Sequence, residues 1–206
     1  MQRDHRTFQT HRVTNHLFHL PPDLPVPIDD GAASHLRGAT LPQIVLPATH
    51  GAPVPLHTLH RAVIFFYPRT GVPGFPTGRD WDEIPGARGC TPQSCAFRDM
   101  NSEFVALGVS LFACSTQTTT FQQEFSQRNH IPFPILSDAD LVLTRQLRLP
   151  CFEFAIHDFG GGGPTTLIRR MAWYVESGAI RHVWYPVFPP DKNAEEVFSW
   201  LRQSRG

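Results

Sequence analysis

The chain has 206 residues, enough for one ordinary domain with an extension, and its 41% hydrophobic content favours a packed core over disorder. Lysine and arginine together number 18, as do aspartate and glutamate, so the formal net charge is zero. Without an excess of either sign, the charge gives no support to a role at nucleic acids or membrane surfaces.

The first 40 residues are expected to form an irregular extension, followed by a domain over residues 41–206. Four prolines between positions 21 and 27 disfavour helix there, and Leu17, Phe18 and Leu20 are apolar residues suited to anchoring the segment to a core. The N-terminus lacks the features of a signal peptide, and no run of about 18 apolar residues predicts a transmembrane helix. We therefore expect a cytoplasmic protein without a membrane partner.

Four downstream segments are predicted to be strands. Arg61–Tyr67 is a continuous apolar, β-branched and aromatic run, which is typical of a strand buried on both faces. Gly108–Cys114 has a similar composition. The last two predicted strands, Trp173–Val175 and Ile180–Tyr185, flank a hairpin-like turn at Glu176–Ala179.

Helical patterns fall between these strands. Over Thr91–Leu107, apolar residues recur near one face at 3.6 residues per turn, which predicts a helix. Shorter helices are predicted over residues 118–130, 138–148 and 192–203. The alternation of strands and helices predicts an α/β fold built on βαβ units.

The segment between Tyr67 and Asn101 carries the residues best suited to chemistry. A buried strand ends, a loop rich in proline and glycine follows, and Cys90 comes where a helix is predicted to begin, with Pro92 in its first turn. At a helix N-terminus, unpaired N–H groups and the positive end of the dipole favour the thiolate, which is the nucleophilic form of cysteine. Cys90 is therefore a candidate nucleophile.

A second cysteine, Cys95, follows five residues after Cys90. In an intact helix, these positions lie about 140° apart around the axis and about 7.5 Å apart along it. A disulfide needs Cα atoms within about 7 Å and converging Cβ atoms. If the two cysteines bond, the first helical turns must unwind, so the pair is predicted to act as a redox switch.

Other interpretations of the cysteines stay open at this point. The cytoplasm would keep thiols reduced, which disfavours a structural disulfide, and zinc would need two close pairs of ligands. Inert buried thiols are the remaining alternative, and Cys114, at the end of a predicted strand, is expected to be one. For Cys151, a second resolving role is the less favoured interpretation. No metal site is predicted.

At these residues the sequence resembles the peroxiredoxins, specifically the peroxiredoxin Q or bacterioferritin comigratory protein branch. The stretch GCTPQSCAFRD looks like that branch's active-site helix, and FFYPRTG looks like the strand that enters the active-site loop. HIPFPILSDAD is similar to the region before the third helix, and GAIRHVWYPV with NAEEVFSWL resembles the closing hairpin and final helix. The resemblance runs in consistent order over about residues 41–203.

The resemblance implies a thioredoxin-like fold, with a central mixed β-sheet flanked by helices, and the reduction of hydrogen peroxide and alkyl hydroperoxides. It gives Cys90 the peroxidatic role, Cys95 the resolving role, and thioredoxin or a similar dithiol protein the role of reductant. Arg170 aligns best with the family arginine that stabilises thiolate and peroxide, and Arg169 is the alternative. No metal or organic cofactor is implied, and a monomer is favoured over a dimer.

The loop before Cys90 departs from the family pattern. That pattern has a proline seven residues and a threonine or serine three residues before the peroxidatic cysteine, where this chain has Glu83 and Ala87. The nearest matches are Pro68 and Thr70, which are the candidates for substrate binding. The hydroxyl that orients peroxide in the family comes here from Thr70 folding back, from another group, or is missing.

An apparent insertion over residues 71–88 separates Thr70 from Cys90. Either this insertion forms part of the pocket rim or it is a surface excursion. If the insertion forms part of the rim, the residues expected there include Trp81, Asp82 and Arg88.

Two alternatives to a peroxidase stay open. A non-catalytic redox sensor would use the same switch between Cys90 and Cys95, but it would oxidise once and stop, whereas a peroxidase would cycle. A thiol–disulfide oxidoreductase acting on proteins is disfavoured, because the chain has no Cys-x-x-Cys motif.

Overall fold

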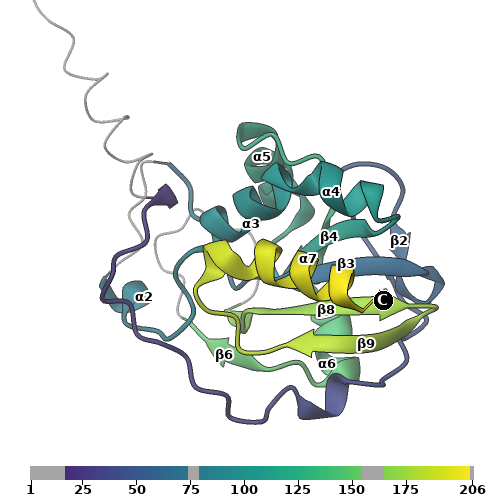
Figure 1. Cartoon of the computed structure of the whole chain (residues 1–206). Coiled ribbons are helices and arrows are strands. Elements are labelled where there is room, and N and C mark those ends of the chain that lie inside the picture. The colour runs from purple at the N-terminus through teal and green to yellow at the C-terminus, as the bar shows by residue number, and fades with distance from the viewer. Residues whose placement is uncertain (1–16, 74–78, 155–164, 205–206) are drawn as a thin grey trace, which may run out of the picture.

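The structure is a computed structural model, and it describes residues 17–73, 79–154 and 165–204. A five-stranded sheet lies at its centre (Figure 1), made of β3 (Arg61–Phe66), β4 (Ser110–Ser115), β5 (Ile135–Ser137), β8 (Met171–Glu176) and β9 (Ala179–Trp184). The strand order is β5-β4-β3-β8-β9. The β3–β4 and β4–β5 pairs are parallel, whereas β8 is antiparallel to both of its neighbours. The sheet is therefore mixed, as predicted.

The side chains of β3 alternate between two hydrophobic cores. Residues 63 and 65 belong to one core and residues 62, 64 and 66 to the other, and all five are almost inaccessible to solvent. Successive side chains of a strand point to opposite faces, so a strand with both faces covered must be apolar throughout. This burial explains the continuous apolar run in the sequence.

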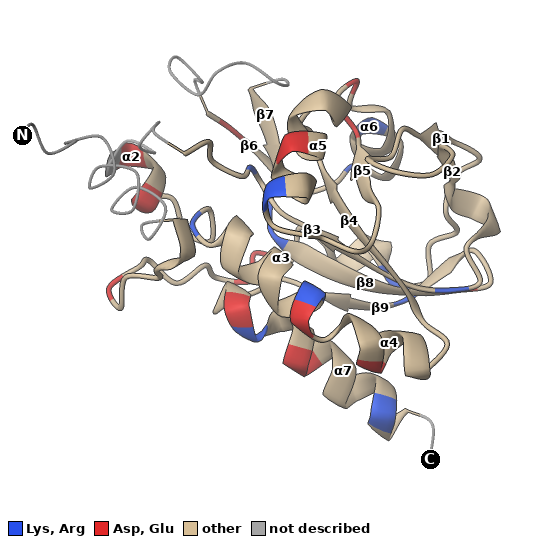
Figure 2. Ribbon diagram, turned by 90° about the horizontal axis from the view of Figure 1, so that it is seen from above, with Lys and Arg blue, Asp and Glu red and all other residues tan. Residues whose placement is uncertain are grey.

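Helices cover both faces of the sheet (Figure 1), and they are α3 (Cys90–Asp99), α4 (Asn101–Ala106), α5 (Thr119–Arg128), α6 (Val142–Leu147) and α7 (Asn193–Gln203). Phe97 of α3, Phe104 of α4, Phe125 of α5 and Val197 of α7 share one core, and Leu143 of α6 belongs to the other. Figure 2 shows α7 with acidic residues near its start and an arginine near its end, an arrangement that complements the helix dipole. No helix in the described part of the chain is long and apolar enough to cross a membrane.

Two predicted helices differ from those in the structure. The single helix predicted over Thr91–Leu107 is divided at Met100, whose φ of −99° and ψ of 10° end α3 and precede α4. The helix predicted over residues 138–148 is shorter at both ends. The Asp138 carboxylate accepts hydrogen bonds from the backbone N–H groups of residues 143 and 144, at 2.9 and 2.8 Å, so it caps α6 from outside.

Several short elements escaped the sequence analysis. They are β1 (Val45–Leu46), β2 (Val54–Pro55), the edge strand β5 (Ile135–Ser137), β6 (Cys151–Glu153), β7 (Thr166–Ile168), α2 (Arg79–Asp82) and the 3-10 turns η1 (Ser34–Leu36), η2 (Leu56–Thr58) and η3 (Pro190–Lys192). None is long enough to show a hydrophobic period.

The end of the predicted extension is held along β9. The backbone N–H of Gly38 donates to the carbonyl of Ile180 at 2.8 Å, and the Ile180 N–H donates to Ala39 at 2.9 Å. Leu36 is fully buried in the core that contains α6. Residues 36–39 therefore belong structurally to the folded body, while the domain boundary at residue 40 stays a prediction.

Candidate active site

The register of β3 and β8 brings two distant segments to one end of the sheet. Phe66, the last residue of β3, pairs with Met171, the first residue of β8. The chain that leaves β3 leads to Cys90, and Arg170 directly precedes β8. Both residues thus lie at the carboxyl end of β3, where α/β sheets usually place their ligand sites.

Cys90 is the first residue of α3, at a turn that requires glycine. Gly89 has a φ of 103°, in the left-handed region, and a Cβ at this position would lie 2.3 Å from the Cγ of Pro190. The Cys90 side chain is only 4% exposed, and its thiol donates to the carbonyl of Ala87 at 3.5 Å. The N-terminal N–H groups of α3 provide the positive potential that the sequence predicted at this cysteine.

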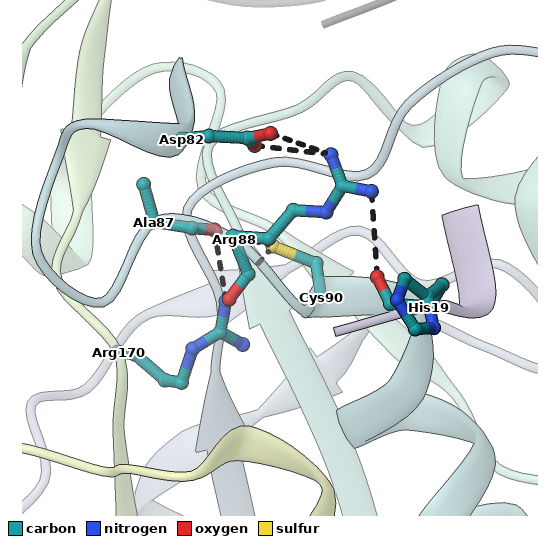
Figure 3. A network of polar contacts seen from close by, with 6 residues as sticks. All are labelled: His19, Asp82, Ala87, Arg88, Cys90 and Arg170. Atoms are coloured by element: carbon teal, nitrogen blue, oxygen red, sulfur yellow. Dashed lines mark hydrogen bonds and ion pairs between the residues drawn. The ribbon is translucent and has the colours of Figure 1, made fainter. Parts of the chain in front are cut away.

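The Arg170 guanidinium contacts the sulfur directly (Figure 3). Its Nη2 lies 3.2 Å from Cys90 Sγ, and the same nitrogen donates to the carbonyls of Ala87 and Arg88 at 3.0 and 3.2 Å. Its Nε donates to the carbonyl of Gly86 at 3.1 Å. One buried cation therefore orders the turn before Cys90 and places positive charge beside its sulfur, where it stabilises a thiolate.

A buried amide connects Arg170 to helix α7. The Nη1 of Arg170 donates to Oε1 of Gln93, and Nε2 of Gln93 donates to Oδ1 of Asn193 at 3.0 Å. Both amide side chains are fully buried. Gln93 lies in the first turn of α3, so this chain of hydrogen bonds fixes that turn against the start of α7.

A cavity of about 20 Å³ opens beside Cys90. It is lined by Leu17, Arg69, Gly71, Trp81, Arg88, Gly89, Cys90 and Thr91. Gly71, Trp81 and Arg88 come from the insertion over residues 71–88, whose described part therefore forms the pocket wall instead of a surface excursion. Arg88 is itself held by the Asp82 carboxylate, with a distance of 3.0 Å between Nη1 and Oδ1 (Figure 3).

Arg69 is a site residue that the sequence analysis missed. Its side chain is 5% exposed, and its guanidinium carbon lies 5.2 Å from the centre of the Phe121 ring. Burial lowers the pKa of Arg69 to about 10, so the side chain still carries its charge at neutral pH. The available signal was its place directly after the buried strand, at the carboxyl end of β3.

Three other candidates from the sequence, Thr70, Pro68 and Arg169, do not line the cavity beside Cys90. The Thr70 hydroxyl donates to Oε1 of Gln117 at 3.0 Å, so in this structure it is committed to that amide. Pro68 lines a separate cavity of about 290 Å³, and Arg169 and Arg170 also line this cavity. Arg169 places its guanidinium carbon 5.9 Å from the centre of the Phe152 ring. The structure thus brings Arg170, and not Arg169, to the sulfur, and it gives no support to peroxide binding by Thr70.

Cys95 lies in the intact helix α3, and its side chain is 8% exposed. Burial raises the pKa of the Cys95 thiol, partly opposed by the positive charge of Arg98. Cys90 and Cys95 are both free thiols in this structure. Because α3 is helical across both positions, a disulfide between them requires the first turns to unwind.

The remaining cysteines lie in environments that disfavour reaction. Cys114 of β4 is fully buried, and burial raises its pKa well above the usual range. Burial also raises the pKa of Cys151 to about 12. Both thiols are protonated at neutral pH, and a protonated thiol is a poor nucleophile. Within the residues that the structure describes, no group of three or more histidine, cysteine or acidic side chains is placed to hold a metal ion.

A family model described as Redoxin matches residues 36–198, which is more than half of the chain. The chain belongs to the Redoxin family. Among its relatives, the chloroplastic peroxiredoxin Q of Sedum lineare is 26% identical over 184 residues, covering 88% of this chain and 86% of the relative. The chloroplastic peroxiredoxin Q of Gentiana triflora is 26% identical over 196 residues, covering 91% of this chain and 79% of the relative.

Solved structures of low identity share the fold of this Redoxin chain. Peroxidoxin BcpB from Mycobacterium tuberculosis has a TM-score of 0.62 at 24% identity, covering 82% of this chain and 98% of its own. A cysteine-to-serine mutant of PrxQ from Xylella fastidiosa has a TM-score of 0.64 at 19% identity, covering 82% and 97%. The comparisons confirm the thioredoxin-like fold and the resemblance to the peroxiredoxin Q branch, and they support the prediction of a thiol-dependent peroxidase.

Proposed function

We propose that this protein is a thiol peroxidase that reduces hydroperoxides with Cys90 as the peroxidatic cysteine and Cys95 as the resolving cysteine. The observation that carries the proposal is the 3.2 Å contact between Arg170 Nη2 and Cys90 Sγ at the start of a helix. A thiolate there is stabilised both by a guanidinium and by backbone N–H groups. The cavity beside the sulfur gives a peroxide access to it.

The first step is nucleophilic substitution at oxygen. The Cys90 thiolate attacks the terminal peroxide oxygen, a sulfur–oxygen bond forms, and the O–O bond breaks. The thiol is oxidised to a sulfenic acid, the peroxide is reduced, and the leaving oxygen takes up a proton to depart as water or an alcohol. Arg170 provides positive charge beside the sulfur and Arg69 provides it in the wall of the same cavity, and both stabilise negative charge as it moves across the O–O bond.

The second step joins the two cysteines. The first turns of α3 unwind, the Cys95 sulfur attacks the sulfur of the sulfenic acid, and water leaves as the disulfide forms. Unwinding breaks the hydrogen bonds that Gln93 makes to Arg170 and Asn193. It also exposes Cys95 to solvent, which relieves the burial that raises its pKa and favours its reactive thiolate.

The cycle closes when an external dithiol reduces the disulfide by exchange, which restores both thiols and oxidises the reductant. We propose thioredoxin or a similar dithiol protein for this role. A monomer suffices for the proposed cycle, since both cysteines belong to one helix.

The test is consumption of hydrogen peroxide coupled to NADPH through thioredoxin and its reductase. We expect sustained turnover by the wild type and none above background by Cys90→Ser. Equal activity of the two proteins would refute the assignment of Cys90. If the wild type oxidises once and does not cycle with any dithiol, the protein is a redox sensor and not a peroxidase.

A further inference from the structure

The N-terminal segment Leu17–Leu20 lies over the start of helix α3. Leu17 lines the Cys90 cavity and is only 9% exposed. Leu20 lies beside Gly89, because a Cβ at that glycine would be 2.9 Å from the Leu20 Cδ2. Two leucines far from Cys90 in the sequence therefore pack directly around the turn that presents the sulfur.

A polar link anchors this segment (Figure 3). Arg88 donates from Nη1 to the carboxylate of Asp82, at 3.0 and 3.4 Å, and from Nη2 to the backbone carbonyl of His19 at 3.4 Å. The Arg88 side chain is itself buried. The Arg88 guanidinium, two residues before Cys90 in the chain, thus connects the N-terminal segment at His19, two residues after Leu17, to α2.

The cavity beside the sulfur is narrow. The space it offers to a water-sized molecule measures about 20 Å³, and the cavity opens to solvent. Hydrogen peroxide is the smallest hydroperoxide, so it makes the least demand on this space. An alkyl hydroperoxide must also place its carbon group. Leu17 and Trp81 line the same cavity as Cys90, so an alkyl group that enters it with the terminal oxygen meets their side chains.

The larger cavity nearby does not have the sulfur in its lining. It measures about 290 Å³, and its lining includes Pro68, Phe152, Arg169 and Arg170 but not Cys90. Among the described residues, the cavity that includes Cys90 is the one that Leu17 helps to line.

We propose that Leu17 restricts the Cys90 cavity to hydrogen peroxide and excludes bulky alkyl hydroperoxides, so that the N-terminal segment sets the substrate preference. This inference rests on the proposed peroxidase function. The reaction is the one given above: the Cys90 thiol becomes a sulfenic acid, and hydrogen peroxide is reduced to water.

The test measures oxidation of Cys90 in a single turnover, by rapid quenching with an alkylating reagent and mass spectrometry, without any reductant. Rate constants for hydrogen peroxide and for tert-butyl hydroperoxide are compared in the full-length wild type, Leu17→Ala and Phe18→Ala. Phe18 is the matched control, since it is the next residue but is 46% exposed and does not line the cavity. Leu17→Val provides a smaller change should Leu17→Ala lower the melting temperature.

We divide the rate constant for tert-butyl hydroperoxide by that for hydrogen peroxide, and we expect Leu17→Ala to raise this ratio by about tenfold or more. A tight pocket discriminates on this scale between substrates that differ by one methylene. Leu17→Val should give a smaller increase and Phe18→Ala none. A wild type that reacts equally fast with both peroxides, or a ratio unchanged in all variants, would overturn the proposal while leaving the peroxidase function intact. A wild type whose Cys90 reacts with neither peroxide would instead overturn the peroxidase function itself, and this inference with it.

Discussion

Cys90 and Cys95 lie on the same helix, within two turns of each other, in opposite environments. Cys90 begins the helix and has the Arg170 guanidinium 3.2 Å from its sulfur. Cys95 lies inside the helix, where burial raises the pKa of its thiol. In the proposed cycle, the start of the helix stabilises the thiolate of the first cysteine, and burial disfavours ionisation of the second until the helix opens.

The largest effect is expected for removal of the second thiol. Cys95→Ser should still consume one equivalent of peroxide at Cys90, but catalytic cycling with thioredoxin should fall to background because no disulfide can form. The measurement is peroxide consumption under single-turnover and steady-state conditions. Cys151→Ser is the matched control. Burial raises the pKa of Cys151 to about 12, so this thiol should take no part in the cycle and the variant should turn over normally. Normal cycling by Cys95→Ser would contradict the resolving role.

A smaller but still large effect is expected at the first thiol. Arg170→Met removes the cation beside Cys90 and should slow peroxide oxidation of this cysteine by about 100- to 1000-fold, as for loss of one donor to a developing anion. Stopped-flow or rapid-quench kinetics measure the rate constant. Arg169→Met is the control, because the guanidinium of Arg169 lies over the Phe152 ring. Its rate constant for Cys90 oxidation should be nearly that of the wild type. Equal losses in the two variants would contradict the direct role of Arg170.

Variation of pH separates the two thiols further. A thiol with a raised pKa is mostly protonated, and its thiolate fraction grows as pH increases. Once the helix opens, the exposed Cys95 thiol should have an ordinary pKa of about 8.5, so disulfide formation from the Cys90 sulfenic acid should accelerate by about eightfold from about pH 7 to 8. Mass spectrometry of quenched samples follows this step separately from oxidation. A rate that is constant across this range would show that ionisation of Cys95 does not control resolution.

The smallest effect concerns the hydrogen bond that ties the first turn of α3 to α7. Asn193→Ala removes the acceptor for Gln93, and one hydrogen bond contributes about 0.5–1.5 kcal/mol. Opening of the turn should become easier, so disulfide formation should accelerate by about two- to tenfold, while oxidation of Cys90 keeps its rate. Unchanged disulfide formation in a folded variant would show that this contact does not restrain the helix.

The sequence was sufficient for features encoded locally. The apolar run of β3 and the position of Cys90 at a helix start both follow from neighbouring residues, and the family resemblance added Arg170. Contacts between distant segments were not predictable. Leu17 has no signal other than being apolar, and its packing at the Cys90 cavity joins residues more than 70 positions apart in the chain. Arg69 was missed although it follows a buried strand directly, because an arginine in a loop is usually solvated.

The most direct test of the account is to treat the reduced protein with one equivalent of hydrogen peroxide and map its thiols by trypsin digestion and mass spectrometry. Cleavage after Arg88 and Arg98 leaves both Cys90 and Cys95 on one peptide. We predict that this peptide loses two hydrogen atoms as the internal disulfide forms, while Cys114 and Cys151 stay reduced. Oxidation of either of those two cysteines ahead of this peptide would contradict the assignment of Cys90 as the nucleophile.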